Sequence, residues 1–205
     1  LRAVWTVLPA RMPGTTTPDS GLGPMSIDAH PPAEADTEFS RMSESELQEL
    51  DLLLAARASP WWDGFYGNRG KPCPFFCAAP DESLAHWVRD RTLRPGLALD
   101  LGCGNGRNAI FLARQGFAVE AVDYSRAAVE WARERVADAG VNVDLRRGNL
   151  FDLGLEPGAY DLVYDSGCFH HMPPHRRKQY VDLVTRALKP CGWFGLTCFM
   201  PHGGS

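Results

Sequence analysis

The stretch LALDLGCGNGRNAIFLARQG, residues 97–116, constrains the fold more than any other part of the 205-residue chain. An apolar run containing Asp100 leads into three glycines at alternate positions, and a helical pattern begins at once. A strand that passes through a glycine-rich turn into a helix opens a parallel βαβ unit. Because glycine carries no side chain, this turn lets a ligand approach the backbone closely.

The rest of the second half repeats this alternation of strand and helix. We expect strands at 97–101, 118–122, 141–145, 160–164 and 193–198, and helices near 107–115, 126–139 and 174–188. Ser125 is the expected N-cap of the second helix and Gly140 its stop. The pattern predicts an α/β fold with a mostly parallel, doubly wound sheet and helices on both faces.

The part before Pro95 is organised differently. Ser43 and Glu46 have the spacing of a capping box, which predicts a helix from residue 43. Residues 59–80 are rich in aromatic residues, proline and glycine, so we interpret them as ordered but irregular, and Asp81 then caps a short helix.

These patterns divide the chain into a leader and one domain. Residues 1–41 have no sustained period and are expected to be disordered or poorly packed. The domain is residues 42–205, with an N-terminal helix and aromatic lid segment at 43–92 and a core at 97–205.

The composition bears on which partners the protein is expected to bind and where it is expected to reside. The net charge of −4 offers no concentrated basic face, so nucleic acid is not an expected partner. The basic run 175–178 begins a helical pattern and is expected on its solvated face. No apolar run approaches the roughly 20 residues of a membrane span, and six scattered cysteines without a secretory signal fit reduced thiols in the cytoplasm. Their spacing predicts no metal site.

The spacing within the glycine loop argues against two common cofactors. Gly102, Gly104 and Gly106, with Asn105 between the last two, give G-x-G-x-G. A dinucleotide fingerprint would place its third glycine at 107, where this chain has Arg107. No Gly-Lys-Ser/Thr tripeptide closes a phosphate-binding P-loop.

Acidic residues around the loop favour a nucleoside with positive charge. Asp123, followed by Tyr124, ends the second expected strand, where a carboxylate can accept both ribose hydroxyls, although a helix cap or a solvated carboxylate remains an alternative. Asp100 would repel a pyrophosphate and attract an ammonium or sulfonium. The segment 149–152 supplies further contacts, with Asp152 able to accept from an adenine amino group and Leu150 or Phe151 able to pack on the ring beside Asn149.

Five segments together resemble the class I S-adenosylmethionine-dependent methyltransferases, which have a Rossmann-like fold. The segments are LDLGCGNGRN, VEAVDYS, GNLFDL, YDLVYDSGCFHH and LKPCGWFGLTCF. WWDGFYGNRGKPCPFF and CFHH are more similar to the small-molecule branch that includes thiopurine and tellurite methyltransferases. The family has seven strands, so the resemblance implies a fragment whose strand at 193–198 is left as an exposed apolar edge.

The resemblance implies transfer of a methyl group from S-adenosylmethionine to a small-molecule acceptor at oxygen, nitrogen or sulfur. Asp165 follows the fourth expected strand, and His170 and His171 come shortly after it. We therefore expect Asp165 and His170 as catalytic residues, with His171 a further candidate base. The alternatives are an NAD-dependent oxidoreductase and a non-catalytic nucleoside-binding module.

Overall fold

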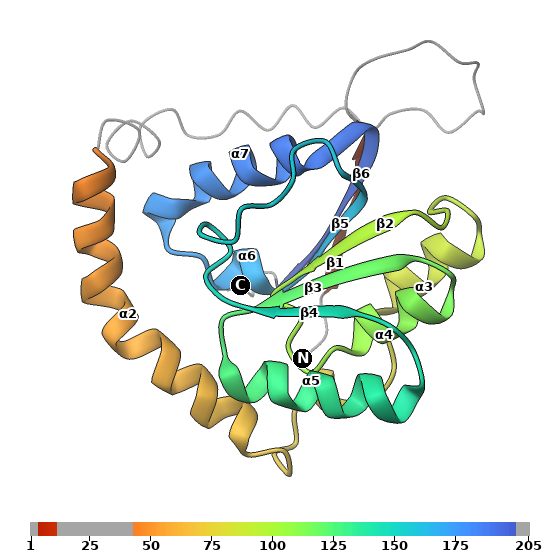
Figure 1. Cartoon of the computed structure of the whole chain (residues 1–205), viewed down its shortest axis with the longest axis horizontal. Coiled ribbons are helices and arrows are strands. Elements are labelled where there is room, and N and C mark those ends of the chain that lie inside the picture. Colours follow the sequence, from red (N-terminus) through yellow and green to blue (C-terminus); the bar gives the residue numbers. More distant parts are fainter. Residues whose placement is uncertain (1–3, 12–42, 200–205) are drawn as a thin grey trace, which may run out of the picture.

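The computed structural model describes residues 4–11 and 43–199 (Figure 1). The elements in chain order are β1 (Val4–Arg11), α2 (Glu44–Gly67), η1 (Pro74–Phe76), α3 (Glu82–Arg89), β2 (Leu97–Leu101), α4 (Arg107–Arg114), β3 (Ala118–Asp123), α5 (Arg126–Ala139), β4 (Asp144–Arg147), β5 (Tyr160–Ser166), α6 (Cys168–His171), η2 (Pro174–Arg176), α7 (Arg177–Ala187) and β6 (Leu188–Phe199).

One sheet organises the described residues, in the order β1-β6-β5-β2-β3-β4. Strands β2 to β6 pair in parallel, and helices α3, α4 and α5 lie on the opposite face of the sheet from α6 and α7 (Figure 1). The predicted doubly wound sheet is thus confirmed. The strand order reverses between β2 and β5, so the crevice at their carboxyl ends is the place where such a sheet binds its ligand.

Alternate residues of β2 feed two separate cores. Ala98 packs in a cluster with Trp87 and Leu112 from the α3 and α4 side, whereas Leu99 packs with Val184 of α7 on the other side. Burial on both faces explains why the strand reads as a continuous apolar run. Asp100, at 1% exposure, is the one charged residue in this buried strand.

Two helices begin, and one of them ends, where the capping residues in the sequence predict. Both hydrogen bonds of the Ser43–Glu46 capping box are present at the start of α2. Ser125 caps α5 through its hydroxyl, which accepts from the Ala128 N–H, and Gly140 ends α5 with φ +64°. These positions confirm the predictions made from the capping residues.

The aromatic segment is more helical than expected. Helix α2 continues through Pro60 to Gly67, so the first part of 59–80 is not irregular. Trp62, Phe65 and Tyr66 lie three and four positions apart, and their rings contact one another along one helix face. This packing offsets the cost of a proline within the helix.

Three other boundaries shift. Strand β4 begins at Asp144 rather than 141, and the helix expected at 174–188 is a 3-10 turn followed by α7. Strand β6 begins at Leu188 and pairs with Tyr160 before its register with β5 shifts. Strand pairing with β5 therefore overrides the proline at 190 as a local boundary signal.

The expected leader is wrong for residues 4–11, which form β1. This strand pairs antiparallel with β6, so β6 is not the exposed apolar edge that we expected. The run of valine, tryptophan and threonine is typical of a strand, and the unpaired backbone groups of β6 supply its partner. Residues 1–3 and 12–42, the rest of the leader, lie outside the described residues.

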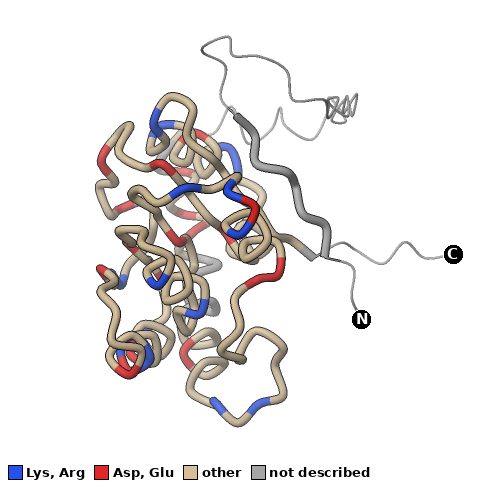
Figure 2. Tube along the Cα trace, turned by 90° about the vertical axis from the view of Figure 1, so that its right-hand side faces the viewer, with Lys and Arg blue, Asp and Glu red and all other residues tan. Residues whose placement is uncertain are grey.

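The surface carries both signs of charge. Figure 2 shows basic and acidic residues interspersed along the trace. The expectation that nucleic acid is not a partner stays a prediction. Within the described ranges, no helix combines the length and apolarity needed to cross a membrane, and no group of three or more His, Cys, Asp or Glu residues is placed to hold a metal ion.

Candidate active site

The glycine loop connects β2 to α4 at the switch point of the sheet. Gly102, Gly104 and Gly106 have φ values of +66°, +56° and +77°, a region that favours glycine. A Cβ atom on Gly102 would lie 2.6 Å from Cys168 Cβ, and one on Gly104 would lie 2.6 Å from the Tyr66 hydroxyl. The loop therefore needs glycine both for its conformation and for close approach by neighbouring elements.

Asp123 links the glycine loop to the start of α5. One carboxylate oxygen accepts the Gly104 N–H at 2.8 Å, and the other accepts the Ser125 N–H at 2.8 Å. Burial raises the pKa of Asp123 to about 6, against the opposing effect of these hydrogen bonds. Ser125 rather than Asp123 occupies the N-cap of α5, so the cap alternative does not describe Asp123.

Asp100 is a buried carboxylate with an oxygen left over. Its Oδ2 atom has no hydrogen-bond partner among the described residues. Burial raises the pKa of Asp100 to about 8, and the nearby Asp81 carboxylate adds to the effect while Arg107 opposes it. A buried unpartnered acceptor is costly, which makes this atom a place where a cationic or donor group of a ligand would be stabilised.

The segment after β4 lies beside Asp123. The Gly148 N–H donates to the Asp123 carbonyl at 3.1 Å, and the Asp152 N–H donates to the Asn149 carbonyl at 3.0 Å. Leu150 and Phe151 are partly buried against the α7 core, whereas Asp152 is exposed. The structure thus brings the predicted adenine segment next to the predicted ribose residue.

The end of β5 differs from what we expected. Asp165 has no exposed surface, one oxygen accepts the Cys168 N–H at 2.7 Å, and the other accepts the Phe169 N–H at 2.9 Å and the Tyr180 hydroxyl. Burial raises its pKa to about 6. These contacts do not favour a catalytic Asp165, because its oxygens hold α6 in place rather than face an acceptor.

The two histidines follow on α6. His170 is exposed, and the rings of His170 and His171 contact each other edge to face. The His171 ring also lies edge to face against Trp62 of α2, with ring centroids 4.8 Å apart. Desolvation, with a smaller effect of His170, lowers the pKa of His171, which favours a neutral imidazole able to accept a proton.

A polar network beside the loop was missed from the sequence. Asp81 occupies the N-cap of α3 but makes no side-chain cap bond there. Its carboxylate instead pairs with Arg107 and accepts from Asn108 at 3.3 Å and from the Tyr164 hydroxyl at 2.8 Å. The sequence marks Arg107 as the residue that replaces a fingerprint glycine, but it gives no sign of the pairing with Asp81, which lies 26 positions away.

Aromatic rings form a wall over the glycine loop. Trp61 stacks on Phe65 at 5.3 Å between centroids, and Phe65 stacks on Phe75 at 5.9 Å. Tyr66 is buried and stacks on Phe76 at 5.6 Å. The predicted lid segment therefore lies against the loop, and its α2 part continues to the α6 histidines through Trp62.

The expectation for the basic run is wrong at two positions. His175 and Arg176 are each 5% exposed, because both contact Asp51 of α2. Arg177 and Lys178 are exposed, as expected. The partner carboxylate is more than 120 residues away in sequence, so charge patterning could not reveal it.

Comparison with known proteins identifies the domain that contains the glycine loop. Residues 98–192, from β2 into β6, match the family model described as a methyltransferase domain. The domain that these residues form is that of a class I S-adenosylmethionine-dependent methyltransferase.

Individual relatives share a large part of the chain. The ubiquinone biosynthesis O-methyltransferase of Xylella fastidiosa (strain 9a5c) is 32% identical over 75% of this chain and 60% of its own length. The 2-heptyl-1-hydroxyquinolin-4(1H)-one methyltransferase of Mycobacteroides abscessus is 28% identical over 69% of this chain and 56% of its own. A crystal structure from Pyrococcus horikoshii OT3 is 32% identical with a TM-score of 0.52, covering 55% of this chain and 53% of that one. The chain thus spans somewhat over half the length of these relatives.

S-adenosylmethionine, the cofactor of this methyltransferase family, fits the residues present. The Asp100 oxygen that has no partner among the described residues suits its ammonium or sulfonium, and the glycines at 104 and 106 add no side chains to the loop beside it. A dinucleotide would bring a pyrophosphate to the same carboxylate and be repelled. The assignment to the small-molecule branch with the thiopurine and tellurite methyltransferases stays a prediction.

Proposed function

We propose that this chain transfers a methyl group from S-adenosylmethionine to a small-molecule acceptor. The observation that carries the proposal is Asp100 at the end of β2, a 1% exposed carboxylate whose Oδ2 lacks a partner among residues 4–11 and 43–199. S-adenosylmethionine, when bound, supplies an already activated methyl group. The protein then has to align the acceptor, exclude water and in some cases remove a proton, and no nucleophilic triad is needed.

The binding roles follow from the geometry of the strand ends. Gly102, Gly104, Asn105 and Gly106 would cradle the methionine part against backbone, and Asp123 would accept the ribose hydroxyls with the lone pairs that Gly104 and Ser125 leave unused. Tyr124 and the segment 149–152 would border the adenine. Asp165 would position α6 without touching the acceptor.

The aromatic wall supports a flat acceptor that carries a hydroxyl group. The Trp62 ring contacts His171 of α6, and Trp61 and Phe65 contact Trp62. Such rings stack favourably on an aromatic ligand. One relative is named an O-methyltransferase and another is named for a hydroxyquinolinone, which supports the same acceptor class. His171, with its lowered pKa, or His170 would accept the hydroxyl proton.

The binding assignment is tested with Asp123→Asn and calorimetry of S-adenosylhomocysteine. Loss of a charge-assisted hydrogen bond to ribose costs about 1.5 to 3 kcal/mol, which is roughly tenfold or more in affinity. Asp63→Asn is the matched control, because Asp63 also accepts from residues at the start of α5, namely the Ser125 hydroxyl at 2.7 Å and the Ala127 N–H at 3.2 Å. Unchanged affinity in a folded Asp123→Asn protein would remove Asp123 as the ribose residue.

The activity is tested by release of S-adenosylhomocysteine with a panel of phenols, hydroxyquinolines, thiols and amines. The proposal expects the hydroxylated aromatic compounds to give the fastest turnover, with a loss in His171→Ala or His170→Ala. Tight binding of the nucleoside without turnover on any acceptor would favour the non-catalytic module. Preferred binding of NAD would favour the oxidoreductase.

A further inference from the structure

A buried polar junction joins α2 to the start of α7. Asp51 of α2 lies 3.0 Å from His175 Nε2 through one oxygen and accepts from Arg176 Nε at 2.7 Å through the other. Arg176 is 5% exposed, and the Asp51 carboxylate compensates its buried charge. The guanidinium donates to Asp51 through Nε and to Gln179 through a terminal nitrogen, and the two acceptors together fix its direction.

The same guanidinium lies over a residue of the predicted cofactor segment. Arg176 Cζ is 5.5 Å from the centroid of the Phe151 ring, a cation–π geometry. Phe151 stands in the segment 149–152, beside Asn149, whose side-chain oxygen accepts the Phe151 N–H at 3.3 Å. Arg176 therefore contacts the segment that would border the adenine.

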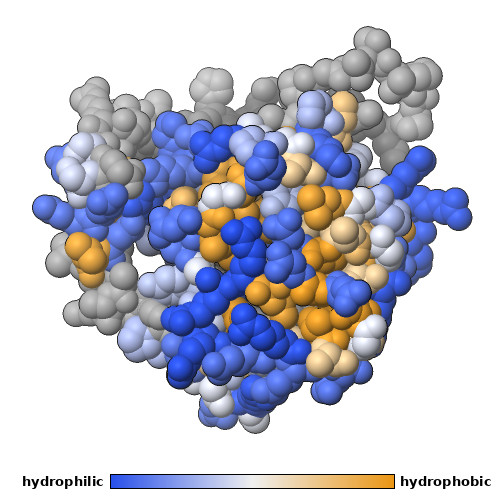
Figure 3. Space-filling model, viewed as in Figure 1, coloured by the Kyte–Doolittle hydropathy of each residue, from blue (hydrophilic) through white to orange (hydrophobic). Residues whose placement is uncertain are grey.

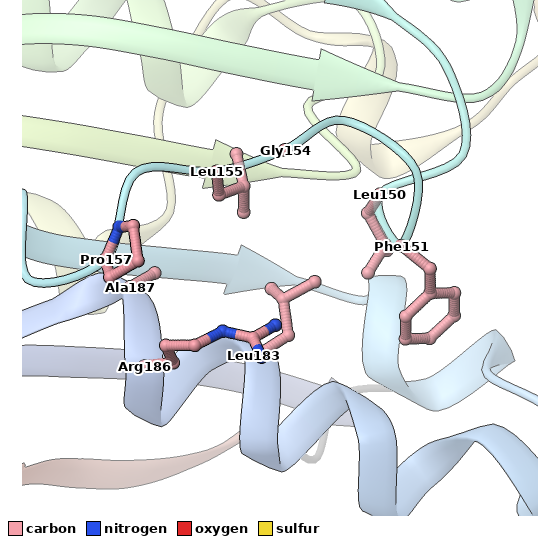
Figure 4. A pocket seen from close by; sticks show the side chains of 8 residues that line it. All are labelled: Leu150, Phe151, Gly154, Leu155, Pro157, Leu183, Arg186 and Ala187. Carbon is pink, nitrogen blue, oxygen red and sulfur yellow. The ribbon is translucent and has the colours of Figure 1, made fainter.

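A cavity borders this segment on one side. Figure 3 shows apolar side chains gathered on this face of the molecule. A cavity of about 320 Å³ lies there, and Leu150, Phe151, Leu155 and Leu183 are among the residues that line it (Figure 4). Phe151 packs against the α7 core on one side and borders the cavity on another, so the contact with Arg176 is one of the few that hold its ring in place.

Helix α2 reaches the site a second time through its aromatic end. Tyr66 lies directly over Gly104, and Trp62 contacts His171. One helix therefore touches the glycine loop, the α6 histidines and, through Asp51 and Arg176, the adenine segment. A shift of α2 would move all three together.

We propose that Asp51 and Arg176 are positioning residues that couple the docking of α2 to the cofactor segment 149–152. Asp51 sets the orientation of Arg176, and Arg176 holds the Phe151 ring against the cavity. The role of the segment in binding adenine rests on the proposed function. The coupling between Asp51 and Phe151 is a property of the fold and is measurable without cofactor.

The first experiment follows amide hydrogen exchange of residues 149–152 in the cofactor-free full chain. Asp51→Asn keeps the shape of the side chain but removes its charge, and it should increase exchange in this segment about tenfold, whereas Lys178→Gln, which removes an exposed pair with Asp182 on α7, should leave it unchanged. Equal exchange in the wild type and Asp51→Asn would overturn the coupling whether or not the chain binds a nucleoside. If Asp51→Asn does not fold, Arg176→Lys replaces it, since it keeps the charge and loses the planar stack.

The second experiment is a double-mutant cycle on S-adenosylhomocysteine affinity. Asp51→Asn and Phe151→Leu should each weaken binding about fivefold, and the double variant should be no weaker than the poorer single variant. Multiplicative losses would overturn the proposal. Failure of the wild type to bind S-adenosylhomocysteine would instead count against the proposed function, and the exchange experiment would then decide the coupling alone.

Discussion

The carboxyl ends of β2 and β5 each carry a buried aspartate, yet the two carboxylates differ in how many hydrogen bonds they accept. Leu101 of β2 is in register with Asp165 of β5, so Asp100 and Asp165 lie at neighbouring strand ends, at 1% and 0% exposure. Three donors surround Asp165, whereas one oxygen of Asp100 has no partner within the ranges that the structure describes. Burial raises the pKa of Asp165 to about 6 and that of Asp100 to about 8. A carboxylate satisfied by the protein holds structure, and one left unsatisfied can take a ligand.

The course of the backbone after each strand explains the difference. Gly167 turns the chain with φ +95° into α6, whose first N–H groups point back to Asp165. Gly102 turns it with φ +66°, but the next N–H, that of Cys103, donates to the Val122 carbonyl instead. The glycine loop therefore directs its first donor toward β3 and not toward Asp100, whose Oδ2 has no hydrogen-bond partner in the described part of the chain.

The largest expected effect on stability comes from adding a side chain where the two strand ends approach each other. Gly102→Ala places a Cβ 2.6 Å from Cys168 Cβ at a positive φ, which would force α6 and the glycine loop apart. Gly140→Ala has nearly the same φ, +64°, but nothing within 4 Å of its Cβ, so it measures the conformational cost alone, about 1 to 2 kcal/mol. Chemical denaturation should show at least about twice that loss for Gly102→Ala. Equal losses would mean that the two ends do not press on each other.

Asp165→Asn tests the satisfied carboxylate. An amide replaces one acceptor oxygen with a donor that faces N–H groups or the Tyr180 hydroxyl, so the free energy of unfolding should fall by about 3 kcal/mol. Tyr180→Phe removes a single donor and should cost less, and Asp182→Asn on the exposed face of α7 should cost little. A variant that is as stable as the wild type but inactive would restore Asp165 as a catalytic residue.

Asp100→Asn should act in the opposite direction on the cofactor-free protein. Removing a buried carboxylate with an unpartnered oxygen should raise the free energy of unfolding near pH 7.5 by about 1 kcal/mol. The same change should weaken S-adenosylmethionine binding more than S-adenosylhomocysteine binding, because the former carries an additional positive charge. Calorimetry with both ligands checks this. Equal weakening of the two would place the sulfonium away from Asp100.

The contacts around the glycine loop follow from the sequence more directly than those around the end of β5, and the reason is the range of the contacts. The glycine loop and Asp123 act through residues within about twenty positions, so a local motif reveals them. Asp165 is held by Tyr180, Arg176 is buried by Asp51, and β6 is paired by β1, and each of these partners comes from another element. Periodicity gives the type of each element, but tertiary contacts decide which charged residue is buried and for what purpose.

The smallest expected effect is a pH dependence that separates the two carboxylates. A carboxyl whose folded pKa is raised above its ordinary value contributes stability that is complete below pH 4 and is lost as pH rises through the folded pKa. Asp165 and Asp123 should therefore have lost their contribution by about pH 7, whereas Asp100 continues to lose its own up to about pH 8.

The melting temperature of the cofactor-free chain should fall by about 2 to 4 °C per pH unit between pH 7 and pH 8, since one proton per unit is worth roughly 1 kcal/mol. Asp100→Asn should flatten this slope, and saturating S-adenosylmethionine should flatten it in the wild type by pairing with the ionised carboxylate. The same slope in the wild type and Asp100→Asn would show that Asp100 is already ionised at neutral pH, and the contrast between the two strand ends would then be one of hydrogen bonding alone.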